Sequence, residues 1–152
     1  MRQNNTTSAD VHAKDSVKIS TIHSIEGIDV EKGILSSGGT FDLYLETLAV
    51  FYDDGINIIE GLNKSIETGD LQLYKAHVHG LKRAAAFVGA FELSEAAYAL
   101  ELAGKQKDLE FIKRHNAGII ESLECLLTCI YDAIKKVVGI PFESNSAVSV
   151  HN

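Results

Sequence analysis

The sequence predicts an all-α protein, an antiparallel four-helix bundle with a short extra N-terminal helix. Apolar residues recur at steps of three and four along four long segments, as expected when one face of each helix packs into a core. No segment shows the strict apolar and polar alternation that is typical of a strand. One proline in 152 residues and the absence of tryptophan also favour long helices over a loop-rich fold.

The N-terminal third is expected to hold a tail, a short helix and a long helix. Residues 1–27 are rich in Ser, Thr and Asn without a sustained period, which predicts a flexible tail or linker. A short helix is expected at residues 30–35 with Asp29 as its N-cap. Thr40 is the expected N-cap of the long helix, which ends at Gly69. Its apolar stripe consists of Phe41, Tyr44, Leu45, Leu48, Phe51, Tyr52, Gly55, Ile58, Ile59, Leu62 and Ile66.

Three further helices are expected after Gly69. Asp70 is the predicted N-cap of the first, which ends or kinks at Gly89, and Asp108 is the predicted N-cap of the last. Their apolar stripes are Tyr74, Val78, Leu81, Ala84, Ala85 and Val88; Leu93, Ala96, Ala97, Leu100 and Ala103; and Ile112, Ile119, Leu123, Leu126, Leu127, Ile130, Ile134 and Val137. The bundle domain is therefore expected at residues 28–138, followed by a C-terminal tail at 139–152.

Charge and composition exclude several classes of protein. A net charge of −7 argues against nucleic acid or an anionic membrane as the main partner. No apolar run approaches the roughly 20 residues that cross a bilayer, and residues 1–20 lack the apolar core of a signal peptide. We therefore expect a cytoplasmic location. Cys125 and Cys129 lie on adjacent helical turns, which rarely suit a disulfide, so reduced and partly buried thiols are favoured over a redox or metal pair.

His79 is the most unusual residue of the predicted bundle. At about 100° per residue it lies almost opposite the apolar stripe of its helix. Lys75, Lys82 and Arg83 flank it at the i−4, i+3 and i+4 positions, together with Ala86 at i+7. An imidazole turned to water and surrounded by cations contributes little to packing but is well placed to hold an anion.

Nucleophilic attack on phosphorus fits this histidine better than other chemistry. The six histidines show no zinc spacing, and His77 and His79 point roughly 160° apart. A general base would need a pocket and an orienting carboxylate, and no carboxylate lies one turn away along the helix. An imidazole nitrogen can instead form a phosphoramidate, which nearby cations stabilise. Lys82 is the best placed cation, and Lys75 and Arg83 are auxiliaries.

A motif extends from this histidine along the helix and beyond it. The segment His79-Gly80-Leu81-Lys82, followed by Gly89-Ala90 and Leu93, resembles the H-x-L-K…G-A…L motif of the histidine-containing phosphotransfer (HPt) domain family. Other shared features are Gly33, the Gly38-Gly39 turn before Phe41, and Gly69-Asp70. The resemblance covers about residues 28–137.

The resemblance implies an intermediate of a two-component phosphorelay. Phosphoryl would pass between His79 and aspartates of response-regulator receiver domains, with Lys82 contacting the phosphoryl group and Gly89 allowing close helix packing near the site. The partners would be receivers and a hybrid sensor kinase, of which this chain is either a free-standing partner or the HPt part. No cofactor of its own is expected, because the receiver supplies magnesium. A monomer without ATP-dependent kinase activity is implied, with an apolar patch and a basic rim as its interface.

Several alternatives remain beside this interpretation. Arg83 departs from the small residue usual in the family, and it either narrows receiver access or contacts the phosphate. A non-catalytic helical adaptor that binds a partner is the alternative function. The dimerisation domain of a sensor kinase also carries an exposed histidine, but an acidic residue follows it there, unlike Gly80-Leu81. His77 is expected to be structural and His115 is unassigned. The aromatic residues expected in the core are Phe41, Tyr44, Phe51, Tyr52 and Phe87.

Overall fold

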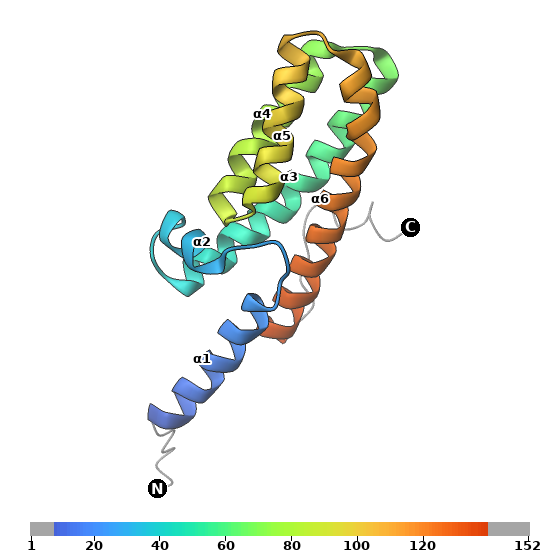
Figure 1. Cartoon of the computed structure of the whole chain (residues 1–152). Coiled ribbons are helices and arrows are strands. Elements are labelled where there is room, and N and C mark those ends of the chain that lie inside the picture. The colour runs from blue at the N-terminus through green and yellow to red at the C-terminus, as the bar shows by residue number, and fades with distance from the viewer. Residues whose placement is uncertain (1–7, 140–152) are drawn as a thin grey trace, which may run out of the picture.

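The computed structural model describes residues 8–139, with side chains from residue 16 onward, and this part of the chain contains six helices and no strand. The helices are α1 (Ser8–His23), α2 (Val30–Ser36), α3 (Phe41–Thr68), α4 (Leu71–Val88), α5 (Phe91–Lys105) and α6 (Leu109–Val138). Helices α3 to α6 form the predicted bundle, in which α4 packs against α3 and α5, and α6 packs against α5 and α3 (Figure 1). None of the described helices combines the length and apolar character needed to span a membrane.

The helix starts follow the capping chemistry that the sequence predicts. Asp29, Thr40, Asp70 and Asp108 each accept a hydrogen bond from the backbone N–H three residues later. Such a bond satisfies one of the donors that the first turn of a helix leaves free. Left-handed glycines then end α3, α4 and α6, at Gly69, Gly89 and Gly139.

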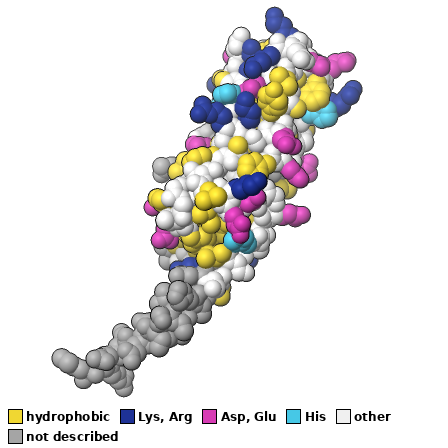
Figure 2. All heavy atoms as spheres, turned by 60° about the vertical axis from the view of Figure 1, so that its left-hand side comes forward, with side chains coloured by type: hydrophobic (Ala, Val, Ile, Leu, Met, Phe, Trp, Pro, Cys, Tyr) yellow, Lys and Arg dark blue, Asp and Glu magenta, His cyan; other side chains and the backbone are white. Residues whose placement is uncertain are grey.

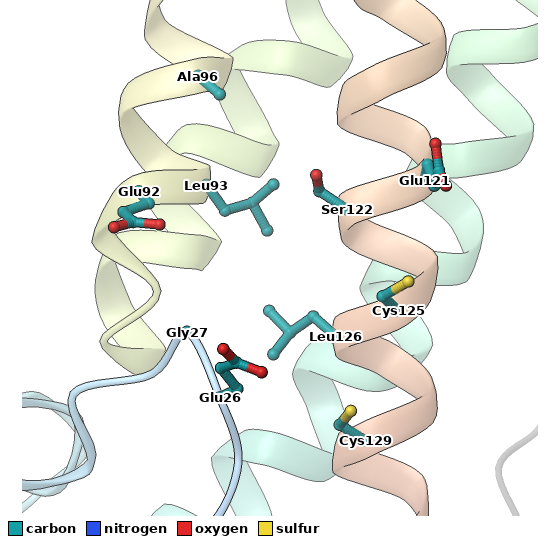
Figure 3. A pocket seen from close by; sticks show the side chains of 10 residues that line it. All are labelled: Glu26, Gly27, Glu92, Leu93, Ala96, Glu121, Ser122, Cys125, Leu126 and Cys129. Carbon is teal, nitrogen blue, oxygen red and sulfur yellow. The ribbon is translucent and has the colours of Figure 1, made fainter.

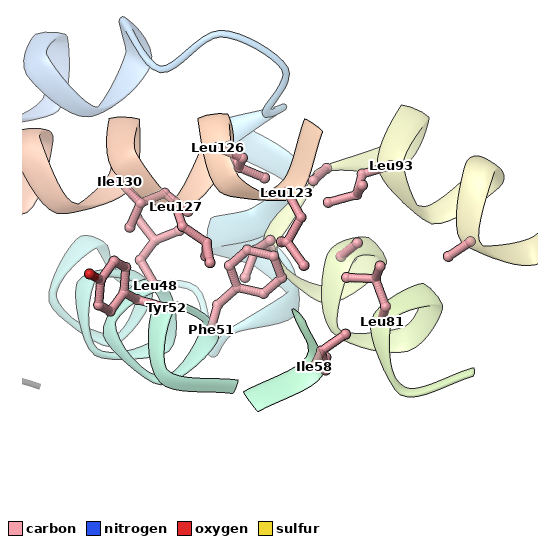
Figure 4. Close-up of a cluster of buried hydrophobic side chains, with 14 of the residues drawn as sticks. Leu48, Phe51, Tyr52, Ile58, Leu81, Leu93, Leu123, Leu126, Leu127 and Ile130 are labelled. Carbon is pink, nitrogen blue, oxygen red and sulfur yellow. The ribbon is translucent and has the colours of Figure 1, made fainter. Parts of the chain in front are cut away.

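The predicted apolar stripes meet in one core, except at Ile66 and Ala96, which are exposed. Leu48, Phe51 and Leu127 are among the buried side chains that α3 and α6 turn toward each other, while Leu81 and Leu93 reach the same core from α4 and α5 (Figure 4). Burying one such side chain contributes about 1.5–3 kcal/mol. Phe87 was wrongly assigned to the core: it is 48% exposed on the outer edge of α4, toward α3.

The prediction of a flexible tail over residues 1–27 was wrong for Ser8–His23, which form α1. This helix has no continuous apolar stripe, and Val17 and Ile19 are exposed. It packs against α6 and extends past the end of the bundle (Figure 1). Ile22 in its last turn and Ile25 just after its end are buried in the core, so this end is fixed by two side chains that the sequence pattern does not single out. The C-terminal tail from residue 140 lies outside the described residues.

Helix α2 closes the end of the bundle where α4 turns into α5. The backbone N–H of Asp29 donates to the carbonyl of Gly89 at 2.9 Å. Gly89 adopts φ +94°, and a Cβ there would collide with the carbonyl oxygen of Asp29. Glycine is thus required at this position both for its backbone conformation and for the close approach.

Candidate functional site

His79 lies in the middle of α4 on its solvent side, as predicted. Its side chain is 51% exposed, whereas the neighbouring Val78 and Leu81 are fully buried. The side chain of Asp70 and the left-handed Gly89 fix the two ends of this helix. The local sequence therefore sets the phase of α4, and with it the outward direction of the imidazole.

A buried carboxylate from the next helix contacts this histidine. Glu101 on α5 is only 4% exposed, and its Oε2 lies 2.5 Å from Nδ1 of His79. The Nζ of Lys82 donates to Oε1 of the same carboxylate at 2.9 Å, and the Nζ of Lys105 lies 3.6 Å from it. One carboxylate thus joins the histidine to two lysines.

The expectation that no carboxylate orients His79 was therefore wrong. It considered only neighbours on the same helix, whereas Glu101 comes from α5, 22 residues later. A signal for it exists in the sequence, because Glu101 follows the buried Leu93 and Ala97 at i+8 and i+4, in register with the apolar stripe. A carboxylate on the buried face of a helix needs a partner, and here the partners are on α4.

The charge of Glu101 determines that the proton of the neutral His79 ring lies on Nδ1. Burial on its own would raise the pKa of the Glu101 carboxyl, but hydrogen bonds from Lys82 and His79 and their charges lower it below its ordinary value. Glu101 is therefore ionised at neutral pH and can only accept hydrogen bonds. Nδ1 of His79 must be the donor, so in the neutral ring the lone pair lies on Nε2.

Lys82 is more enclosed than the sequence suggests. Its side chain is 25% exposed, and its Nζ lies 5.2 Å from the centre of the Tyr98 ring. The hydroxyl of Ser94 donates to the carbonyl of Lys82 at 2.8 Å and ties α5 to the same turn of α4. These contacts hold the ammonium beside the histidine instead of leaving it free in solvent.

The auxiliary cations occupy different places. Lys75 packs its aliphatic stem over Gly104 of α5, where an added Cβ would lie 2.5 Å from its Cγ. Arg83 is exposed on the other side of His79 and lines a groove between α3 and α4. Lys105, which the sequence pattern does not single out, contacts Glu101. Lys and Arg side chains gather in the half of the bundle away from the N-terminus (Figure 2).

Gly89 does not act next to His79, contrary to the role implied for it. Ten residues of helix separate the two, or about 15 Å. Its close contact is with Asp29 at the start of α2, so Gly89 positions the end of α4 and not the site itself.

His77, His115 and the two cysteines lie apart from this cluster. His77 packs against Gly61 of α3, where an added Cβ would collide with the imidazole, consistent with a structural role. His115 lies 4.3 Å from Phe111, measured between ring centres. Among the described side chains, no group of three or more His, Cys, Asp or Glu is arranged to hold a metal ion.

Cys125 and Cys129 are free and exposed, so the expectation of partial burial was wrong. They line a groove between α5 and α6 that also contains Glu92 and Glu121 (Figure 3). Both cysteines fall outside the apolar stripe of α6, whose buried members include Leu126 and Ile130. Both cysteines are exposed because they do not lie on the face of α6 that packs into the core.

Comparison with known proteins identifies one family. A family model described as Hpt domain matches residues 46–130, which include most of α3, all of α4 and α5, and most of α6. No curated protein and no solved structure matches the chain. The matched residues contain His79, Lys82 and Glu101.

Proposed function

This chain belongs to the Hpt domain family, and we propose that its His79 is the phosphoacceptor of a two-component phosphorelay. Hpt domains act in histidine phosphotransfer between the components of phosphorelays. The finer assignment to His79 rests on one observation above all. Its Nδ1 is bound to a buried carboxylate, while its ring stays half exposed.

This arrangement prepares Nε2 for attack on phosphorus. The Nε2 lone pair forms the new bond to phosphorus, while the bond from phosphorus to the donor's aspartate oxygen breaks and its electron pair leaves with the carboxylate. The proton on Nδ1 stays in its hydrogen bond to Glu101, which stabilises the positive charge that develops on the ring. The reverse sequence delivers the phosphoryl group to a second receiver.

Lys82 and Lys105 supply the positive charge for the product. A phosphoryl group on Nε2 carries nearly two negative charges, which ammonium groups within a few ångströms stabilise. Both lysines already converge on Glu101. In this proposal Lys82 contacts the phosphoryl group. The auxiliary role expected for Lys75 and Arg83 is not part of it, because Lys75 packs on Gly104 and neither residue pairs with Glu101.

The partners in this proposal are response-regulator receiver domains and a hybrid sensor kinase, in the cytoplasm. The receiver holds the magnesium ion and the aspartate, so the chain itself needs only to present the histidine. Three exposed apolar side chains, Leu43, Val50 and Phe87, line the α3–α4 groove next to the histidine helix. Covering such a patch is a common source of binding energy in protein interfaces.

Phosphotransfer from a radiolabelled receiver tests this function. Receiver domains labelled with phosphate on aspartate are mixed with the wild type, with His79→Gln and with the matched control His77→Gln. We expect label on the wild type and on the His77 variant, and none on the His79 variant. Label that persists on His79→Gln would overturn the assignment. Incubation of the wild type with labelled ATP alone should give no label.

A helical adaptor is the alternative function, and the same experiment separates the two. An adaptor would bind its partner, as seen by titration calorimetry, without accepting label in any variant. The buried Glu101 bonded to the exposed histidine favours phosphotransfer, because a surface that only binds has no need of an ionised group oriented behind an imidazole.

A further inference from the structure

We propose that Arg83 determines which receivers this protein accepts, by pairing with a carboxylate on the docking surface of the receiver. This inference rests on the proposed function of His79. It concerns partner choice and not the transfer chemistry. The inference about Arg83 and the proposed function of His79 can therefore fail separately.

Arg83 lies beside the histidine but outside its charge cluster. It is one turn after His79, with Cβ atoms about 5–6 Å apart. Around the helix axis it is displaced by about 40° toward α3, whereas Lys82 is displaced by about 60° in the opposite sense, toward α5. The contacts agree with these angles, since Lys82 bonds Glu101 and Arg83 lines the α3–α4 groove.

The guanidinium of Arg83 is available to a partner. Within residues 16–139, the ion pairs of the site all involve Glu101, with His79, Lys82 and Lys105. No carboxylate of these residues pairs with Arg83, although Glu46 and Asp54 line the same groove. An exposed, unpaired guanidinium in this position has its full charge and all five N–H donors free.

Docking of a receiver must bring Arg83 into the interface. The donor aspartate has to reach Nε2 of His79, so the receiver surface around it covers the helical turn that holds Arg83. The exposed Leu43, Val50 and Phe87 of the same groove lie beneath that surface as well. A guanidinium at the edge of an apolar contact loses water and is stabilised only if a carboxylate faces it. Receivers with a neutral or basic residue there are disfavoured.

Transfer kinetics with charge variants test this inference. Receiver domains from the source organism are labelled with acetyl phosphate and mixed with wild type, Arg83→Lys, Arg83→Ala and Arg83→Glu. For accepted receivers we expect Arg83→Glu to raise KM at least about tenfold with little change in the limiting rate, an effect that weakens at high salt. The KM of Arg83→Ala should lie between the values of the wild type and Arg83→Glu. The KM of Arg83→Lys should stay closest to that of the wild type. Arg114→Glu on α6, also exposed, controls for net charge and should behave as wild type.

A small phosphodonor separates docking from chemistry. Phosphoramidate requires no protein interface, so it should label His79 at the same rate in the wild type and in all Arg83 variants. The inference is overturned if Arg83→Ala speeds transfer from receivers, since the side chain would then be an obstruction. It is also overturned if KM is unchanged in Arg83→Glu. The same holds if the rate of phosphoramidate labelling falls in the Arg83 variants in parallel with the rate of transfer from receivers. If the wild type accepts label from neither donor, the proposed function itself fails.

Discussion

The hydroxyl of Tyr44 on α3 donates to the carbonyl of Val88 in the last turn of α4, at 2.8 Å. Both residues are buried, and this bond joins the two helices that border the proposed docking groove. Burial, and to a lesser degree the charge of Asp29, raises the pKa of Tyr44. The hydroxyl therefore stays protonated and remains a donor at any ordinary pH.

Tyr44→Phe should lower the free energy of unfolding by about 1–2 kcal/mol. The ring would still fill its place, but the carbonyl of Val88 would lose the hydroxyl and remain buried. Urea denaturation followed by circular dichroism measures the change. Tyr98→Phe is the control, because that side chain is 48% exposed and its loss of a hydroxyl should have little effect. Equal stability of Tyr44→Phe and wild type would show that the bond contributes nothing.

Glu101→Gln should change how stability depends on pH. The pKa of Glu101 is lower in the folded protein than its ordinary value of 4.5. Such a group contributes stability above the unfolded-state pKa, and the contribution disappears as the pH falls through the lower folded-state pKa. We expect the variant to be less stable by about 1–3 kcal/mol at pH 7, and the difference from wild type to shrink below about pH 4.5.

Denaturation curves at pH 7, 5, 4 and 3.5 measure this difference. Glu95→Gln is the matched control, since Glu95 lies on the same helix, is exposed, and has no ion pair among the residues described. A difference between Glu101→Gln and wild type that stays constant across the series would contradict an ionised Glu101 in the folded protein.

Lys82→Ala should slow transfer from a receiver and shorten the lifetime of the phosphohistidine by about tenfold or more. The lost interaction is a charge-assisted contact worth about 1.5–3 kcal/mol. Rapid quenching of labelled protein gives both rates. Lys75→Ala is the control, because Lys75 packs on Gly104 instead of pairing with Glu101. An unchanged rate and lifetime would remove Lys82 from the mechanism.

Gly89→Ala should destabilise the protein by about 1–3 kcal/mol through backbone strain, with a further cost from the collision with Asp29. Gly69→Ala separates the two effects. Gly69 also has a positive φ, of +70°, but a Cβ there meets nothing within 4 Å. In thermal unfolding, the melting temperature of Gly89→Ala should therefore be well below that of Gly69→Ala. Equal melting temperatures would mean that the contact between α2 and the end of α4 is not rigid.

Both cysteines should react with Ellman's reagent in the native protein, because both are exposed. Mild oxidation should not join them. On adjacent turns of α6 their Cβ atoms are about 5–6 Å apart, whereas a disulfide needs about 3.8 Å. Mass spectrometry after oxidation and alkylation would detect an internal disulfide, which would require local unwinding of α6.

Local chemistry made most of the fold predictable. The four N-caps and the apolar stripes depend on residues within a few positions of one another, so single-sequence patterns were enough to find them. Helix α1 was missed because its packing depends on Ile22 and Ile25 at one end, without a repeated stripe. That packing is tertiary, and a periodic pattern does not report it.

The site was only half predictable for a related reason. The exposure of His79 and the position of Lys82 follow from helical phase alone. The contact with Glu101 depends on how α4 and α5 pack, since the two residues are 22 positions apart. The exposure of Phe87 likewise depends on how closely α3 approaches α4 at their outer edge. Neighbouring helices set these features, and the spacing along one helix does not.

In the proposed phosphotransfer, the bond between His79 and Glu101 would also limit which product can form. Phosphohistidine exists as two isomers, and Glu101 occupies the nitrogen that would give one of them. In the proposed phosphotransfer the ring would need no flip between receiving and releasing the phosphoryl group, because Nδ1 would stay bonded to Glu101 and Nε2 would react in both steps. A site held ready in this way has little reorganisation left to make during the reaction. If His79 is the phosphoacceptor, the movement that each transfer requires would therefore fall on the partner that arrives and leaves.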